Sequence, residues 1–190
     1  MTKIFLLDNH DSFTYNLASM FNKYQDVDLH ISYPESTNIA KISDFDKIIF
    51  SPGPGLPSES KTMFEILSKY SNTHPILGVC LGHQAIGEFY GAKLKNMSIV
   101  NHGMNKNLHY TSSKSSIYKE IPDKSEIGVY HSWYISKNDF PKDLNITGLN
   151  AEDKIMSIEH KYLPIIGLQF HPESFITKYG FKMIENWIKT

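Results

Sequence analysis

The sequence has 190 residues, of which 41% are hydrophobic and 21% charged, and its formal net charge is −1. This length and composition are typical of one globular domain over residues 1–190, and the near-neutral charge favours neither nucleic acid nor a membrane surface as a partner. No apolar run is long enough to span a bilayer, and the N-terminal apolar stretch predicts a strand rather than a signal peptide. The single cysteine excludes an internal disulfide and a multi-cysteine zinc site, so we expect a cytoplasmic protein.

Strand and helix patterns alternate through the first half of the chain. Apolar runs that end at polar or glycine-rich stretches predict buried strands at 3–8, 26–34, 44–51 and 74–80. Apolar residues at helical spacing predict helices at 13–24, 58–71 and 81–91. Because alternating strands and helices form parallel sheets covered by helices, this half predicts an α/β fold with an open, mostly parallel sheet flanked by helices.

The pattern changes from Lys93 onward. Turns rich in Asn, Asp, Pro and Gly separate short strand candidates at 92–103, 106–112, 127–136, 143–150, 154–162 and 164–172. These short strands predict an additional antiparallel strand region in the second half of the chain. A helix over 173–190 is expected to close the same domain, since no linker or repeat interrupts the sequence.

Cys80 stands between two glycines, Gly78 and Gly82, after an apolar strand and before a helix. The same pattern with serine is the nucleophile elbow, a sharp turn in which flanking glycines avoid collisions between Cβ atoms. The helix N-terminus behind Cys80 favours a thiolate, and the backbone N–H of Leu81 would be free to donate to an oxyanion. A buried structural cysteine is the alternative, but the glycines and the strand–helix context favour a nucleophile.

His171 is the strongest candidate for the base that a cysteine nucleophile needs. It follows an apolar strand in "GLQFHPES", and Pro172 keeps the backbone extended, so Glu173 should lie on the same side as His171. A carboxylate in that position fixes the tautomer of the imidazole and raises its basicity, as the third group of a catalytic triad does. The motif H-P-E alone is more typical of a surface turn with a solvated His and Glu; together with the elbow, and at the end of a second buried strand, it predicts a triad.

The remaining histidines are weaker candidates. His30, His74, His109 and His160 lie in loop or strand-like stretches without other catalytic signals. A metal site is the competing use of histidine, and its conceivable ligands are His10, Asp11, His83 and His171. No pair among them has a ligand spacing such as H-x-x-x-H, so we expect no metal.

The loop "FSPGPGLP", residues 50–57, follows the third predicted strand. Alternating proline and glycine make a stiff loop in which Gly53 or Gly55 could supply a second oxyanion donor, whereas Pro54 has no N–H. A tight loop without function is the alternative. A phosphate-binding loop is not expected, because no G-K-S/T sequence follows.

Six motifs along the chain together resemble those of the class I, or triad-type, glutamine amidotransferases. They are found at Asp8–Leu17, Ser51–Pro57, Gly78–Gly87, His102–Gly103, Val129–Trp133 and Phe170–Phe175. Within that superfamily, the opening D-x-x-D-S-F-T-Y-N is similar to the glutaminase subunits of anthranilate synthase and aminodeoxychorismate synthase. The resemblance implies Cys80 as the nucleophile, His171 as general base and acid, and Glu173 as the group that orients His171.

The resemblance also implies a glutamine-binding site and no metal or organic cofactor. Its residues would be Gly53, Pro54, Gly55, Leu81, Gln84, Ser132 and Trp133. In this set Gly53 and Leu81 supply oxyanion amides, and Gln84 holds the α-amino and carboxylate end of glutamine. Backbone groups of Ser132 and Trp133 assist. Two positions depart from the family pattern: Met104 stands where lysine is common, and Trp133 stands where leucine is usual.

A glutaminase of this type implies a partner, because free ammonia would be protonated in bulk water before use. The resemblance implies a separate chorismate-using synthase subunit that makes anthranilate, in the tryptophan pathway, or aminodeoxychorismate, in the folate pathway, or both. Residues 9–16 are the candidate contact, with an ordinary capped helix as the alternative. Two other functions stay open: a stand-alone γ-glutamyl hydrolase and a non-catalytic regulatory subunit.

Overall fold

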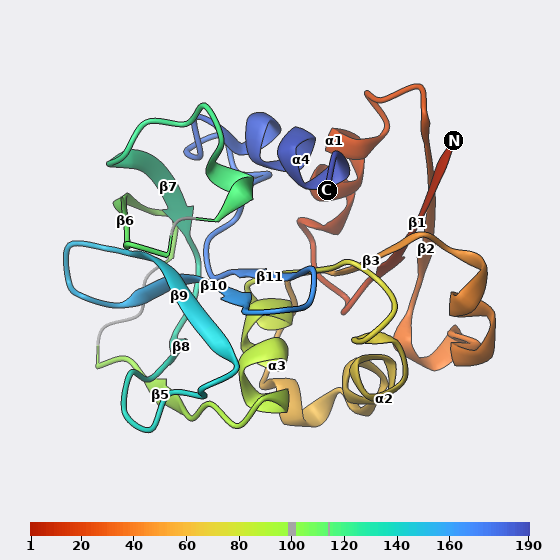
Figure 1. Ribbon diagram of the computed structural model, residues 1–190, viewed down its shortest axis with the longest axis horizontal. Coiled ribbons are helices and arrows are strands. Elements are labelled where there is room, and N and C mark those ends of the chain that lie inside the picture. The colour runs from red at the N-terminus through yellow and green to blue at the C-terminus, as the bar shows by residue number, and fades with distance from the viewer. Residues whose placement is uncertain (99–101, 114) are drawn as a thin grey trace.

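A nine-stranded sheet forms the centre of the molecule, and half of it is parallel (Figure 1). The computed structural model describes residues 1–98, 102–113 and 115–190. The parallel strands, in spatial order, are β2 (Val27–Ser32), β1 (Thr2–Leu7), β3 (Lys47–Phe50), β4 (Ile76–Val79) and β11 (Ile165–Leu168). This part of the sheet confirms the predicted α/β architecture.

The antiparallel region continues the same sheet beyond β11. Its strands, again in spatial order, are β10 (Ile155–His160), β9 (Leu144–Leu149), β6 (Met104–Tyr110) and β7 (Ser125–Val129). A separate two-stranded antiparallel sheet pairs β5 (Leu94–Asn96) with β8 (Trp133–Ile135). The predicted antiparallel strand region in the second half is therefore confirmed.

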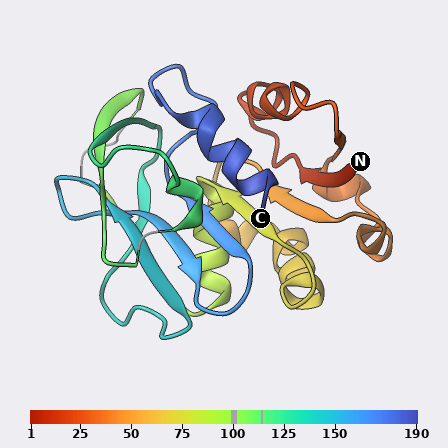
Figure 2. The same ribbon diagram turned by 45° about the horizontal axis from the view of Figure 1, so that its top comes forward.

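Helices cover both faces of the parallel strands, as Figures 1 and 2 show. The helices are α1 (Thr14–Phe21), α2 (Lys61–Tyr70), α3 (Leu81–Phe89) and α4 (Gly180–Ile188). Ile4 and Leu6 of β1 belong to the core shared with α1 and α4, whereas Phe5 and Leu7 belong to the core shared with α2 and α3. Successive residues of a strand face opposite sides of the sheet, so a strand buried on both sides is a continuous apolar run.

Two expectations about the second half of the chain are wrong. The last helix begins at Gly180 and not at residue 173, because hydroxyl groups in the intervening turns bind backbone groups instead. Thr177 Oγ1 donates to the carbonyl of His171 at 2.6 Å and accepts from the N–H of Gly128 at 3.0 Å. Such local side-chain bonds compete with helix formation.

The second error concerns residues 127–136, which do not form one strand. The chain leaves the large sheet after Val129, and β8 pairs with β5 in the small sheet. The strand expected over 92–103 is reduced to β5, with residues 99–101 outside the described part of the chain. Two short 3-10 helices, Pro34–Ser36 and Ile39–Asp44, have no counterpart among the expected elements.

The topology places several polar segments at one edge of the sheet. The chain leaves the carboxyl ends of β1, β3, β4 and β11 at this edge, so the segments that begin at Asp8, Ser51, Cys80 and Gln169 start there. Ligands of open parallel sheets bind at the carboxyl ends of the strands. No helix in the described residues is long and apolar enough to cross a membrane.

Candidate active site

Cys80 occupies a strained turn between β4 and α3. Its φ of 51° and ψ of −98° lie in a region that non-glycine residues rarely adopt, and its N–H donates to the carbonyl of Leu168 at 2.7 Å. A Cβ on Gly78 would lie 2.4 Å from the carbonyl oxygen of Gly82, and one on Gly82 would lie 2.6 Å from Cβ of Phe50. Both flanking glycines are therefore required by close backbone packing, and the predicted elbow is confirmed.

His171 and Glu173 form the predicted pair. Nδ1 of His171 lies 2.7 Å from Oε1 of Glu173, and the two side chains are 3% and 0% exposed. Burial alone would lower the pKa of His171, but the neighbouring Cys80 thiol and the Glu173 carboxylate together raise the pKa well above its ordinary value. Because Nδ1 is taken by Glu173, Nε2 is the nitrogen left to exchange a proton at Cys80.

A hollow of about 170 Å³ opens in front of Cys80. Its lining contains all of the predicted binding residues, namely Gly53, Pro54, Gly55, Leu81, Gln84, Ser132 and Trp133, and adds Tyr130 and His131. A larger hollow of about 510 Å³ lies beside β5 and β6, and its lining contains neither cysteine nor histidine. Met104, at one of the positions that depart from the family pattern, lines this larger hollow and not the one at Cys80.

The glycine-proline loop is held against Cys80's helix by close contacts. A Cβ on Gly53 would lie 2.7 Å from both Cβ of Asn9 and Cδ2 of Leu81, so only glycine fits there. Gly55 has a φ of 76°, which also favours glycine. Asn9 joins this loop to the segment after β1: its N–H donates to Ser51 Oγ at 2.8 Å and its side-chain Nδ2 donates to Ser51 O at 3.1 Å. Asn9 lies in the expected partner contact, residues 9–16, but its bonds to the glycine-proline loop were not predicted.

Gln84 lines the hollow, and its side-chain nitrogen already has protein partners. Nε2 donates to the carbonyl of Trp133 at 2.9 Å and to Oε1 of Gln169 at 3.1 Å. His131 Nδ1 lies 2.8 Å from the same Trp133 oxygen, so both lone pairs of that carbonyl are used. Ser132 O accepts one hydrogen bond, from the N–H of Met97 at 2.8 Å, and keeps a lone pair for a further donor.

Comparisons with known proteins agree with this geometry. The family model described as glutamine amidotransferase class I matches residues 5–190. The chain belongs to the class I glutamine amidotransferases. Among its relatives in this family, anthranilate synthase component 2 of Lactococcus lactis is 40% identical over 97% of this chain and 93% of its own. Aminodeoxychorismate/anthranilate synthase component 2 of Bacillus subtilis is 33% identical over 98% of this chain and 96% of its own.

The fold of this amidotransferase also matches a solved structure. A Thermoplasma acidophilum protein provisionally described as one of the subunits of GMP synthase superposes with a TM-score of 0.88 over 100% of this chain and 93% of its own. Its sequence identity is 24%, so the likeness concerns the fold alone.

Two aromatic rings of this amidotransferase pack against His171. The rings of Tyr130 and Phe13 lie edge-on to His171, with centroids at 4.9 Å and 5.8 Å. The hydroxyl of Tyr130 lies 2.9 Å from Ser174 Oγ. Both aromatic residues stand in motifs that carry the resemblance, but their packing against His171 was not predicted, since nothing local in the sequence indicates it.

Two further buried histidines of the amidotransferase stay neutral: His131, which lines the hollow, and His83 of α3. Burial lowers the pKa of His131 to about 4 and that of His83 to about 3. Neither ring nitrogen of His83 has a hydrogen-bond partner in the described part of the chain. Within residues 1–98, 102–113 and 115–190, no three His, Cys, Asp or Glu side chains are grouped so that they could hold a metal ion.

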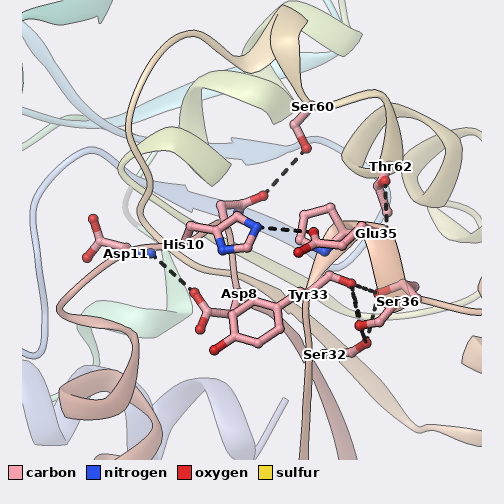
Figure 3. Close-up of polar contacts among 12 residues, drawn as sticks. Asp8, His10, Asp11, Ser32, Tyr33, Glu35, Ser36, Ser60 and Thr62 are labelled. Atoms are coloured by element: carbon pink, nitrogen blue, oxygen red, sulfur yellow. Dashed lines mark hydrogen bonds and ion pairs between the residues drawn. The ribbon is translucent and has the colours of Figure 1, made fainter.

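The segment after β1, residues 8–16, forms a structured rim next to the site, and Figure 3 shows the polar contacts of its first residues. Oδ1 of Asp8 accepts from Thr14 Oγ1 at 2.7 Å and from the N–H of Asp11 at 3.2 Å. His10, with a φ of 60°, stacks on Tyr33 at 4.8 Å and lies 3.1 Å from Glu35 Oε2. A third hollow, of about 250 Å³, is lined by residues of this rim and by Pro54 and Leu81. It shares Pro54 and Leu81 with the hollow at Cys80.

Proposed function

We propose that this chain is the glutaminase subunit of a chorismate-using synthase. It would hydrolyse glutamine through a cysteine thioester and deliver ammonia for the formation of anthranilate, aminodeoxychorismate or both. The observation that carries the proposal is the hollow that holds Cys80, Gln84 and both candidate oxyanion loops, with a buried His–Glu pair next to Cys80. The names of the two relatives, both of them component 2 of such synthases, support the choice of this branch.

The proposed mechanism begins with attack by the Cys80 thiolate on the carboxamide carbon of glutamine. The oxyanion that forms is stabilised by the N–H of Leu81 and by an amide of the glycine-proline loop, Gly53 in the first place and Gly55 beside it. Each such donor is worth roughly a hundredfold or more in rate. His171 donates its proton to the leaving nitrogen, so the C–N bond breaks and ammonia departs from a γ-glutamyl thioester.

Hydrolysis then regenerates the enzyme. His171, now neutral, takes a proton from water, and the resulting hydroxide attacks the thioester carbon. The C–S bond breaks, glutamate leaves, and the thiolate–imidazolium pair is restored. Every group in these steps belongs to this chain, to glutamine or to water, so we propose that the half-reaction uses no cofactor. A nucleophilic thiol that must stay reduced fits a cytoplasmic location.

The glutamine backbone is proposed to bind at Gln84 and Ser132. The carbonyl of Trp133 has both lone pairs occupied, so the α-amino group of glutamine is better served by the carbonyl of Ser132. Trp133 then acts as a wall of the pocket. This assignment refines the role expected for the Ser132–Trp133 backbone.

Ammonia must reach a second active site, and we propose a synthase subunit that docks beside the hollow. The rim after β1 supplies the contact, because it adjoins the hollow through Pro54 and Leu81 and exposes Tyr15, which is 64% accessible. The structured loop around Asp8 presents this surface without further ordering on binding.

The experiment uses the Cys80→Ser variant together with the synthase subunit that co-purifies from the native cell. Glutamine-dependent product formation should be lost, by a factor of roughly a thousand or more, while ammonia-dependent synthesis continues. Persistent glutamine hydrolysis would overturn the role of Cys80. Rapid hydrolysis of γ-glutamyl peptides without any partner would indicate a stand-alone hydrolase, and failure of a glutamine-mimicking electrophile to label Cys80 would indicate a non-catalytic subunit.

A further inference from the structure

We propose that Gln169 is a positioning residue that holds Cys80 as a thiolate and connects it to Gln84. The inference rests on the proposed glutaminase function and extends it to a residue outside the triad and outside the substrate hollow. The side chain of Gln169 lies between Cys80 and Gln84. Its Nε2 lies 3.7 Å from Cys80 Sγ, and its Oε1 accepts a hydrogen bond from Gln84 Nε2 at 3.1 Å.

The direction of this chain of hydrogen bonds is fixed at one end by a backbone carbonyl. Trp133 O can only accept, so the Gln84 atom next to it must be the amide nitrogen. That nitrogen also lies next to Gln169, so the atom it meets there must be the carbonyl oxygen Oε1. The remaining end of the Gln169 carboxamide, its NH₂ group, therefore faces the sulfur of Cys80. A rotation of either amide by 180° would put two donors or two acceptors together.

Gln169 is buried and does not line the hollow at Cys80. It is fully buried, it follows β11, and its backbone N–H donates to the carbonyl of Met156 at 2.8 Å. It is absent from the lining of the hollow at Cys80, so it acts through Cys80 and Gln84 rather than on glutamine.

An N–H aimed at sulfur favours the thiolate over the thiol, because hydrogen bonds to charged acceptors are stronger than those to neutral ones. His171 supplies the cation on one side of the sulfur, and Gln169 supplies a neutral donor from the strand end behind it. Since Gln84 orients that donor, the residue that recognises glutamine and the nucleophile share one hydrogen-bonded chain.

The test measures alkylation of Cys80 by iodoacetamide as a function of pH. Cys80 is the only cysteine in the sequence, so the rate reports one thiol. Gln169→Met, which keeps the volume but removes the donor, should move the midpoint of the profile up by about one pH unit, with roughly tenfold slower alkylation below the midpoint. The kcat for glutamine should fall about tenfold with KM nearly unchanged, since a tenfold rate loss corresponds to about one such unit.

Gln169→Glu provides the second variant. It keeps an acceptor for Gln84 but places an ionisable oxygen against the sulfur, so the shift should be larger than that of Gln169→Met. The matched control is Asn186→Leu, which removes another buried carboxamide whose Nδ2 donates to the carbonyls of Ile117 and Lys119. This control should lower the free energy of unfolding and leave the alkylation profile unchanged.

The outcomes separate this inference from the proposed function. Alkylation needs no glutamine, so the shift is measurable even in a chain that does not hydrolyse glutamine. Wild-type alkylation profiles in folded Gln169→Met and Gln169→Glu would overturn the role of Gln169 while leaving the glutaminase intact. If Asn186→Leu shifted the alkylation profile as much as Gln169→Met does, the shift would reflect lost stability. Gln169 would then be a merely structural residue, and the proposal would likewise be overturned.

Discussion

Two neighbouring regions of this protein contain buried histidines whose pKa values are shifted in opposite directions. Around His171, Cys80 and Glu173 outweigh burial and hold the pKa of His171 well above its ordinary value. In the region of His83 and His131, burial lowers the pKa values to about 3 and about 4. The difference teaches that charged partners, and not depth in the protein, decide which histidine carries a proton at neutral pH.

The two regions influence each other through charge. A proton on His171 lowers the pKa of His131, and His131 in turn lowers that of His83. Burial is the largest cause of the lowered pKa at both His83 and His131, and the imidazolium of His171 adds to it at His131. A neutral His131 donates from Nδ1 to the carbonyl of Trp133 and so helps to hold the pocket wall.

Glu173→Gln should have the largest effect on the difference between the two regions. It removes the carboxylate next to His171 and leaves a buried imidazole like that of His131. The pKa of His171 should fall, and kcat for glutamine should fall on the order of 10³-fold to 10⁴-fold, as expected when the orienting acid of a triad is replaced by its amide. Steady-state kinetics and an NMR titration of the histidines would measure both effects.

The control for Glu173→Gln is Glu185→Gln, which makes the same chemical change in a partly exposed carboxylate of α4 that pairs with Lys182 and Lys189. It should leave kcat unchanged. Normal turnover in Glu173→Gln would show that Cys80 alone suffices to hold His171 in its protonated form against the effect of burial.

His83→Met tests the other region through stability in acid. The unfolded chain takes up a proton at His83 near pH 6.5, whereas the folded protein does so only near pH 3. Between these values the unfolded state binds more protons, so stability falls as the pH falls, by about 1.4 kcal/mol per unit. At pH 4.5 the variant should have lost roughly 2–3 kcal/mol less than the wild type relative to pH 7.

Urea unfolding at pH 7 and pH 4.5 measures this difference directly. The packing change in His83→Met affects both pH values equally, so only the acid-dependent part is compared. The same loss in variant and wild type would mean that His83 is not the buried neutral group that makes the fold sensitive to acid.

The sequence predicted the parts of both regions that depend on local pattern. The elbow at Cys80 follows from two glycines beside a cysteine at a strand–helix junction, and the His171–Glu173 pair follows from extended backbone at a proline. The apolar runs of β1, β3, β4 and β11 likewise predicted a parallel sheet, because burial on both faces leaves that pattern. These features need only neighbours in the chain.

The features that were missed depend on contacts between distant segments. Gln169 meets Gln84 across 85 positions of the chain and meets Cys80 across 89. A glutamine at the end of an apolar strand carries no local sign of such partners. The start of α4 was misplaced for a similar reason, since Thr177 accepts a hydrogen bond from the N–H of Gly128, 49 positions away.

Tyr130→Phe should have the smallest effect. It separates the packing of the Tyr130 ring on His171 from the effect of the charged partners of His171. The ring of Tyr130 packs edge-on to His171, while its hydroxyl bonds to Ser174 Oγ and touches no charged group of the triad. Loss of one such hydrogen bond costs about 0.5–1.5 kcal/mol of stability, and kcat should stay within about twofold because the ring remains. Thermal unfolding and glutamine kinetics would measure the two quantities. A loss of kcat approaching that of Glu173→Gln would mean that the hydrogen bond between Tyr130 and Ser174 holds the imidazole of His171 in place. The carboxylate of Glu173 would then no longer suffice to explain why His171 differs from His83 and His131.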